Sequence, residues 1–297
     1  MAQQSLRHLL NRYCRARLNL RALAPLKAAV SRADRVAQAR RARPAMIRDL
    51  SGGFIASVMR DCLADHRSER TANNARKSLL TLWRWAEDQG LQVRPVPRKP
   101  LPRLTEPELL PQAWTLAEVR RLAATAGEWA GTWAFGVPAC LGWRLGISIL
   151  WDSGARVGEL LAARVGDVAM DSAMWTVPAR NRKGRRRPKV YRLHPETVTL
   201  LRRRTEWGGD ALWPVPWKRP QSLWDHFAKV VVAAGLPNDR WHKFHCLRRS
   251  SESLAASIRG VAWAASAVGH SEAVALRSYI SPLVCPAPCL ADAVPAI

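Results

Sequence analysis

The sequence has few cysteines and no long apolar run. Its six cysteines include no Cys-x-x-Cys pair and no histidine partner at zinc-finger spacing, so we expect no zinc site and a reducing, cytoplasmic setting. The first residues lack the apolar core of a secretory signal, and the most apolar stretch, from Trp129 to Trp151, is interrupted by Arg144 and by glycines. We therefore expect a buried helix there and no association with a membrane.

Acidic residues are also scarce. The chain has 23 Asp and Glu against 47 Lys and Arg, which gives a formal net charge of +24 at pH 7. Such an excess favours a polyanionic partner, and arginine suits bidentate contacts with phosphate groups. Nucleic acid is the leading partner on these grounds, with a ribosomal-type or simply basic protein as the alternative.

The length and the apolar content predict two folded domains. The chain has 297 residues, of which 48% are hydrophobic, and this is ample for two cores. Residues 1–93 show apolar residues at helical spacing, and their last helix carries Arg76 and Lys77 before its apolar face. Repeated prolines over residues 94–112 predict an extended, basic linker. Residues 113–297 then form the second domain.

The second domain is predicted to contain helices and one small β-hairpin. Thr115 and Glu118 match a capping box, which predicts a helix that begins directly after the threonine. Strand-like segments at 174–177 and 189–193 flank a basic turn near Lys183. The predicted fold class is therefore mainly α with a small β-sheet, an all-helical first domain being followed by a mixed α/β second domain.

The last third of the chain combines a polar helix face with an apolar one. His245 and Arg248 lie three residues apart, so they share a face of a predicted helix. Apolar residues at helical spacing are predicted to point toward the core: Leu247, Leu254 and Ile258. Polar groups suited to chemistry are thus expected on one side of a helix that packs by the other.

A corner between two further helices follows. Gly269 can end one helix and Ser271 can cap the next, which places His270 at the corner and Tyr279 nine positions beyond that histidine. Together with the preceding His-x-x-Arg motif, this order of residues resembles the C-terminal signature of the tyrosine recombinase (phage integrase) family.

Two upstream segments strengthen the resemblance. Residues 153–168 are similar to the segment that carries the family's first catalytic arginine, a position held here by Arg156 in a helix that Ser153 is expected to cap. Residues 182–193 are similar to the family's hairpin, whose turn presents a catalytic lysine just before a glycine, and Lys183 is the matching residue. The choice of this lysine rests on the resemblance, because a basic turn alone is a common surface feature.

The resemblance implies a site-specific DNA recombinase or integrase that cleaves and rejoins DNA through a 3′-phosphotyrosyl intermediate, with no metal ion or other cofactor. Double-stranded DNA is the implied partner, with a homotetramer assembled on it, because exchange between two duplexes needs four nucleophiles. The implied catalytic residues are Arg156, Lys183, His245, Arg248, His270 and Tyr279, with Glu159 in support. The residues expected to contact DNA are Arg76, Lys77, Arg182, Arg185 and Arg186.

These residue types suit the cleavage of a phosphodiester. The diester is anionic, so a pair of arginines can stabilise the charge that grows on its non-bridging oxygens. A phenol with an ordinary pKa near 10 needs cationic surroundings and a neighbouring base, and either His245 or His270 can take its proton. A general acid is then needed for the leaving 5′ oxygen, and the resemblance assigns this role to Lys183.

Three alternative functions stay open. A type IB topoisomerase uses the same nucleophile but relaxes DNA without a partner duplex, and a catalytically idle DNA-binding protein can have the same fold. A regulator built on a basic helical domain is the third. The filled catalytic positions of the resemblance argue against the idle protein, and the regulator is the remotest of the three.

Overall fold

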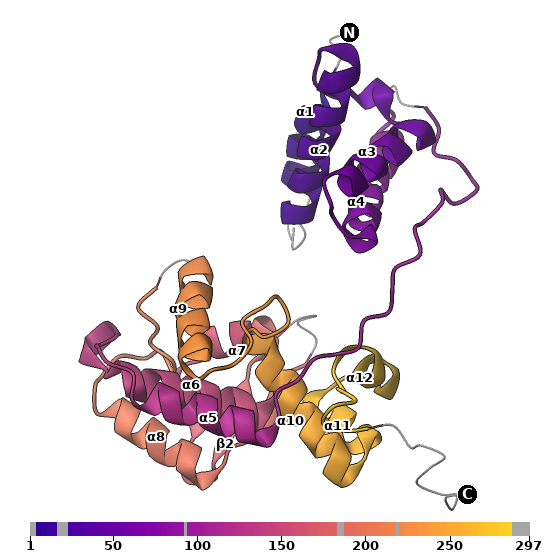
Figure 1. The fold of residues 1–297 in the computed structure, drawn as a ribbon. Helices are drawn as coiled ribbons and strands as arrows, with labels where there is room; N and C mark the ends of the chain where they lie inside the picture. Colours follow the sequence, from indigo (N-terminus) through magenta and orange to yellow (C-terminus); the bar gives the residue numbers. More distant parts are fainter. Residues whose placement is uncertain (1–3, 17–22, 92–93, 183–186, 218–219, 287–297) are drawn as a thin grey trace, which may run out of the picture. The chain divides into compact units, whose positions relative to one another are not determined.

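The computed structural model describes residues 4–16, 23–91, 94–182, 187–217 and 220–286. The chain divides into two compact units, Met1–Glu108 and Leu109–Ile297 (Figure 1). Each unit has a buried apolar core of its own, so each has what a folded domain requires.

The first unit is built from helices, as predicted. These are α1 (Leu6–Ala16), α2 (Leu23–Arg41), α3 (Gly52–Ala64) and α4 (Glu69–Asp88), with a short 3-10 helix at Ile47–Asp49. The α4 helix packs against the other three. Ser68 caps α4 by accepting a hydrogen bond from the backbone of Thr71, and the buried Leu79, Leu82 and Trp83 form its inward face.

The second unit contains the remaining helices and the sheet. Its α-helices are α5 (Leu116–Gly127), α6 (Ala139–Ser153), α7 (Val157–Leu161), α8 (Pro195–Thr205), α9 (Pro220–Ala233), α10 (Phe244–Arg259), α11 (Val261–Val268) and α12 (Glu272–Ser278). The most apolar stretch of the sequence forms α6 from Ala139 onward, and this helix contacts α5, α7, α8, α10 and the sheet. Within the described ranges, no helix is long and apolar enough to cross a membrane.

Aromatic side chains fill much of the core of the second unit. Trp143 and Trp213 are almost fully buried, and the rings of Phe227 and Phe244 stack with centroids 3.8 Å apart. Trp143 lies within 6.4 Å of both phenylalanine rings. Phe244 is the first residue of α10, so this packing fixes the start of the helix that also carries His245.

The sheet has three short antiparallel strands in the order β1 (Val168–Ala169), β2 (Met174–Val177) and β3 (Lys189–Arg192). Trp175 pairs with Tyr191, and Val177 pairs with Lys189. Because side chains alternate along a strand, Lys189 shares the inward face of β3 with the buried Tyr191, whereas Val190 and Arg192 are exposed. The predicted mainly α fold with a small β-hairpin is confirmed.

One predicted helix cap is wrong. Ser153 is the last residue of α6, where its hydroxyl donates to the carbonyl oxygen of Ile149 and accepts from the backbone of Ala155. Gly154 ends α6 in the left-handed conformation, with φ of 56°. The chain then turns, and Arg156 takes the N-cap position of α7.

Candidate active site

Tyr279 lies at the centre of a cluster of basic side chains in the second unit. The tyrosine follows α12 directly and is 8% exposed. Its ring centroid lies 4.9 Å from the guanidinium carbon of Arg248, 5.3 Å from the ring centroid of His245 and 4.7 Å from that of His270. The His270 ring is nearly parallel to the phenol ring, at 15°. Three residues from the sequence resemblance, Arg248, His245 and His270, thus surround the phenol of a fourth, Tyr279.

Arg248 is a buried cation beneath this phenol. The side chain belongs to α10, is 2% exposed, and donates a hydrogen bond from Nη1 to the carbonyl oxygen of Gly154. Its Nε is buried and has no hydrogen-bond partner in the described part of the chain. Burial, followed by repulsion from Arg156, lowers the pKa of Arg248. An unsatisfied buried donor is costly, so a hydrogen-bond acceptor that reached this Nε would stabilise it.

Arg156 is held by Glu159 from the same short helix. The carboxylate, 2% exposed, accepts from the backbone N–H of Arg156 at 3.0 Å and from Nη1 of its guanidinium at 3.3 Å. The arginine side chain keeps 36% of its surface exposed. Glu159 therefore orients Arg156 while leaving the guanidinium accessible to a ligand, in the supporting position that the resemblance gave it.

His245 faces a set of positive charges. Desolvation by the surrounding protein, and then repulsion from Arg248, Arg249 and Arg156, lower the pKa of His245 to about 4. The residue nevertheless remains accessible to solvent. At neutral pH its imidazole is therefore uncharged, and a neutral imidazole can accept a proton.

The hairpin brings a lysine to the site, although not the one selected from the sequence. Lys183 lies outside the described residues. Lys189 donates from Nζ to the carbonyl oxygens of Ser266 and Ala267, at the C-terminal end of α11. Burial, and then repulsion from Arg182 and Arg248, lower its pKa to about 8. Inward and outward positions alternate along β3, so Lys189 lies on the same side as the buried Tyr191. This alternation is the sequence signal that points to Lys189.

Gly269 allows the hairpin to approach the corner closely. The glycine ends α11 in the left-handed conformation, with φ of 89°. A Cβ atom placed on it would lie 3.0 Å from Nζ of Lys189 and 3.5 Å from Nη2 of Arg182. A larger residue would thus be strained in its backbone and would press on the lysine. The Gly-His motif therefore has a structural reason as well as a chemical one.

A buried carboxylate that sequence reasoning missed contacts His270. Glu252 is 1% exposed on α10, and Nε2 of His270 lies 2.9 Å from its Oε1 and 3.2 Å from its Oε2. The expectation that Ile258 points toward the core is wrong, because Ile258 is 69% exposed. The inward face of this part of α10 instead carries Glu252 and small residues, which the leucine spacing could not reveal.

The residues predicted to contact DNA differ in burial and in their hydrogen bonds. Arg76, in α4, is partly buried and donates a hydrogen bond to the carbonyl oxygen of Leu101. This bond holds the segment around Leu101 against α4. Lys77 is exposed. Arg182 donates from Nη1 to the carbonyl oxygen of Arg187 at 3.1 Å. The remaining two, Arg185 and Arg186, lie outside the described residues.

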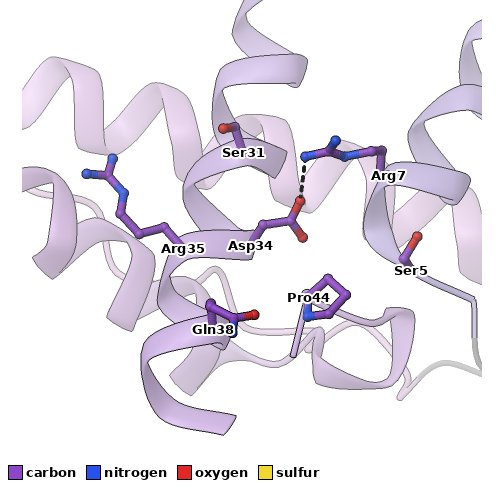
Figure 2. A pocket seen from close by; sticks show the side chains of 7 residues that line it. All are labelled: Ser5, Arg7, Ser31, Asp34, Arg35, Gln38 and Pro44. Carbon is purple, nitrogen blue, oxygen red and sulfur yellow. Dashed lines mark hydrogen bonds and ion pairs between the residues drawn. The ribbon is translucent and has the colours of Figure 1, made fainter. Parts of the chain in front are cut away.

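A separate pocket lies in the first unit and has a different character (Figure 2). Its volume is about 550 Å³, and it is lined by Ser5, Arg7, Ser31, Asp34, Arg35, Gln38 and Pro44. Arg7 and Asp34 form an ion pair across it at 3.2 Å. None of the residues singled out from the sequence as catalytic or DNA-contacting lines this pocket, so the cluster around Tyr279 is the candidate active site.

Comparisons with known proteins agree with the fold. No protein-family model matches the sequence, and no curated protein sequence matches it. Among solved structures, XerH site-specific recombinase bound to a palindromic difH substrate matches with a TM-score of 0.71 at 18% identity, over 93% of this chain and 81% of that chain. A lambda integrase tetramer bound to a Holliday junction matches with a TM-score of 0.65 at 18% identity, over 91% and 75%.

A third match, the Tn1549 transposon integrase in complex with circular intermediate DNA, has a TM-score of 0.64 at 16% identity and covers 94% of this chain and 95% of that chain. All three are tyrosine recombinases. At these identities the comparison establishes a shared fold. The chain therefore has the tyrosine recombinase fold that the sequence resemblance predicted.

The charge state of His245 can be tested directly. In a pH titration followed by NMR on histidine-labelled protein, the ring signals of His245 should change with a midpoint near 4, because burial and the facing arginines disfavour the imidazolium. The signals are assigned by their loss in His245→Gln. Arg156→Gln removes one facing charge and should move the midpoint upward. A midpoint near 6.5 in the unmodified protein contradicts this description of the site.

Proposed function

We propose that the chain is a site-specific DNA recombinase that cleaves and rejoins DNA by metal-independent transesterification at Tyr279. The observation that carries the proposal is the enclosure of the Tyr279 ring by Arg248, His245 and His270, in a chain with a formal net charge of +24. The three solved structures with the same fold add support, since each of those proteins is bound to DNA.

In the proposed cleavage step, the oxygen of Tyr279 attacks the phosphorus of a phosphodiester. A bond forms between this oxygen and phosphorus, and the bond from phosphorus to the 5′ oxygen of the next nucleotide breaks. The phenol proton goes to His245, which is uncharged at neutral pH because its pKa is lowered to about 4. Arg248 and Arg156 stabilise the charge on the non-bridging oxygens.

The leaving 5′ oxygen takes its proton from a lysine. We assign this role to Lys183, following the resemblance, and give Lys189 a different one. The ammonium group of Lys189 is occupied by two carbonyl oxygens at the end of α11, where the helix dipole also favours a cation. Lys189 thus holds the hairpin to the corner that carries His270.

Reversal of this step completes the exchange. A free 5′ hydroxyl of another strand attacks the phosphorus of the 3′-phosphotyrosyl bond and gives its proton to Lys183. The new phosphodiester forms, the bond from phosphorus to the Tyr279 oxygen breaks, and the phenol takes back its proton from His245. The bond energy is kept in the phosphotyrosine, so the proposal requires no metal ion or nucleotide. Exchange between two duplexes needs four such nucleophiles, so we also propose a homotetramer on DNA, like the lambda integrase tetramer bound to a Holliday junction.

Phenylalanine at position 279 should separate cleavage from binding. On a nicked substrate whose 5′ fragment diffuses away, the unmodified protein should accumulate a covalent adduct with DNA, visible by denaturing gel electrophoresis. Tyr279→Phe should form none while binding DNA with unchanged affinity, because only the attacking oxygen is removed. Tyr13→Phe, in the first unit, is the matched control and should form the adduct. An adduct with Tyr279→Phe would falsify the assignment of the nucleophile.

The two lysines should respond differently to a better leaving group. Lys183→Ala should lower the cleavage rate on ordinary DNA by about a hundredfold or more, within the range for loss of a general acid. Lys189→Ala should lower it by about a hundredfold, because misplacement of reacting groups is similarly costly. With sulfur in place of the leaving 5′ oxygen, cleavage by Lys183→Ala should recover, because a thiolate leaves without protonation. Cleavage by Lys189→Ala should not, since its defect is in the position of the corner. If sulfur restores cleavage by Lys189→Ala but not by Lys183→Ala, then Lys189 is the general acid and Lys183 is not.

A further inference from the structure

Glu252 is a buried acid in a site otherwise crowded with positive charge. The residue lies one helical turn after Arg248, and its carboxyl side chain is fully shielded from solvent. Burying an ionised carboxylate is costly unless a partner compensates for the lost water. His270, Arg248 and Lys189 all act to stabilise the charged form, although burial dominates and raises the pKa of Glu252.

The hydrogen-bond partners of His270 determine how many protons the pair holds. Nδ1 lies 3.2 Å from the carbonyl oxygen of Ser271, which can only accept, so Nδ1 carries a proton. Nε2 faces the carboxyl group of Glu252, with the hydrogen bond to Oε2 at 3.2 Å and Oε1 at 2.9 Å. That contact is a hydrogen bond only if one further proton lies between the two groups.

Two descriptions of this pair are equivalent in charge. In one, an imidazolium faces a carboxylate; in the other, a neutral imidazole accepts from a carboxylic acid. Both contain the same protons, and both have zero net charge. The pair therefore adds no negative charge to a site meant for an anion, and both nitrogens of His270 are engaged.

The engaged ring is also the one that packs on the nucleophile. The His270 and Tyr279 rings are stacked, with centroids 4.7 Å apart. A ring fixed at both nitrogens cannot rotate freely, and it cannot accept the phenol proton while Nε2 shares a proton with Glu252. This leaves the proton-accepting role to His245, and it gives His270 a fixed surface against which the phenol is oriented.

We propose that Glu252 is a positioning residue, which holds the imidazole of His270 flat against Tyr279 through a shared proton and so fixes the direction of the attacking phenol. The proposal rests on the function proposed above, and it gives a carboxyl group outside the sequence resemblance a part in the reaction. What matters is the hydrogen bond and not the negative charge. An amide that donates to Nε2 should therefore replace the carboxyl group, whereas an apolar side chain should not.

Three variants separate these requirements. Glu252→Gln keeps the shape, and its amide N–H can donate to Nε2, so the cleavage rate should stay within about threefold of the unmodified protein. Glu252→Leu fills the space without a donor, and Glu252→Ala leaves it empty; both should be at least about tenfold slower, since small misplacements of reacting groups are costly. All three should bind DNA equally well. Glu272→Gln, at an exposed position of α12, is the matched control and should cleave normally.

A spectroscopic readout tests the pairing without any cleavage. In ¹⁵N NMR spectra at pH 7, the Nδ1 of His270 should be of the protonated type in the unmodified protein and in Glu252→Gln. In Glu252→Leu the bond from Nδ1 to Ser271 remains, so Nδ1 should keep its proton, whereas Nε2 loses its hydrogen-bond partner and its signal should move to that of an unbonded lone-pair nitrogen. The leucine variant keeps the test valid if the alanine variant does not fold.

The outcomes distinguish this proposal from the proposed function. Glu252→Leu cleaving as fast as the unmodified protein overturns it, as does Glu252→Gln being as slow as Glu252→Leu, or a His270 spectrum that is the same in all three proteins. If the unmodified protein forms no adduct with DNA, the proposed function fails, and the Nε2 signal of His270 still decides whether Glu252 holds the ring.

Discussion

The buried guanidinium of Arg248 is the constraint on which the rest of the site depends. A cation that is 2% exposed must be compensated by its surroundings, and this one has a carbonyl oxygen at Gly154 and an aromatic face at Tyr279. These contacts tie together the turn after α6, helix α10 and the segment after α12. The chemistry and the packing of the second unit therefore meet at one side chain. Of the buried acids nearby, Glu159 pairs with Arg156 and Glu252 pairs with His270.

The same concentration of charge explains the unusual acidity of two other groups. Desolvation and the neighbouring arginines lower the pKa of His245 to about 4 and that of Lys189 to about 8. In both cases the charged form is disfavoured for the same two reasons. The result is an imidazole that is uncharged at neutral pH, and an ammonium group that loses its proton more readily than usual. A site assembled to hold an anion thus keeps the His245 imidazole free of a proton at neutral pH.

The sequence predicted most of the elements, because local patterns determine them. The helical spacing of His245 and Arg248, the capping box at Thr115 and the glycine that ends α11 are all present in the structure. Ser153 was misplaced because a serine can accept at a helix start or donate to the preceding turn, and the local sequence suits both. Only the left-handed Gly154 decides between them.

The part of the site that the sequence did not predict, Glu252, was missed for a different reason. Along α10 the spacing of Leu254 and Ile258 predicts an inward face that the structure turns toward solvent at Ile258. The buried face there packs on α11 through small residues, Ala256, Ala264 and Ala265, which give a weak hydrophobic signal. Glu252 belongs to that face, and a glutamate in a helix is normally predicted to be exposed. Its partner lies 18 residues away, and local spacing does not report such a contact.

Peptide mapping of the covalent adduct can identify the residue that forms the bond to DNA, which we propose is Tyr279. The sequence has three tyrosines, and trypsin cleaves after Arg277, so Tyr279 lies in a peptide that begins at Ser278 and contains no other tyrosine. The adduct trapped on a nicked substrate is digested with trypsin and nuclease and analysed by mass spectrometry. We expect a nucleotide attached through its 3′-phosphate to this peptide. Attachment to a peptide that carries Tyr13 or Tyr191, or through a 5′-phosphate, contradicts this expectation.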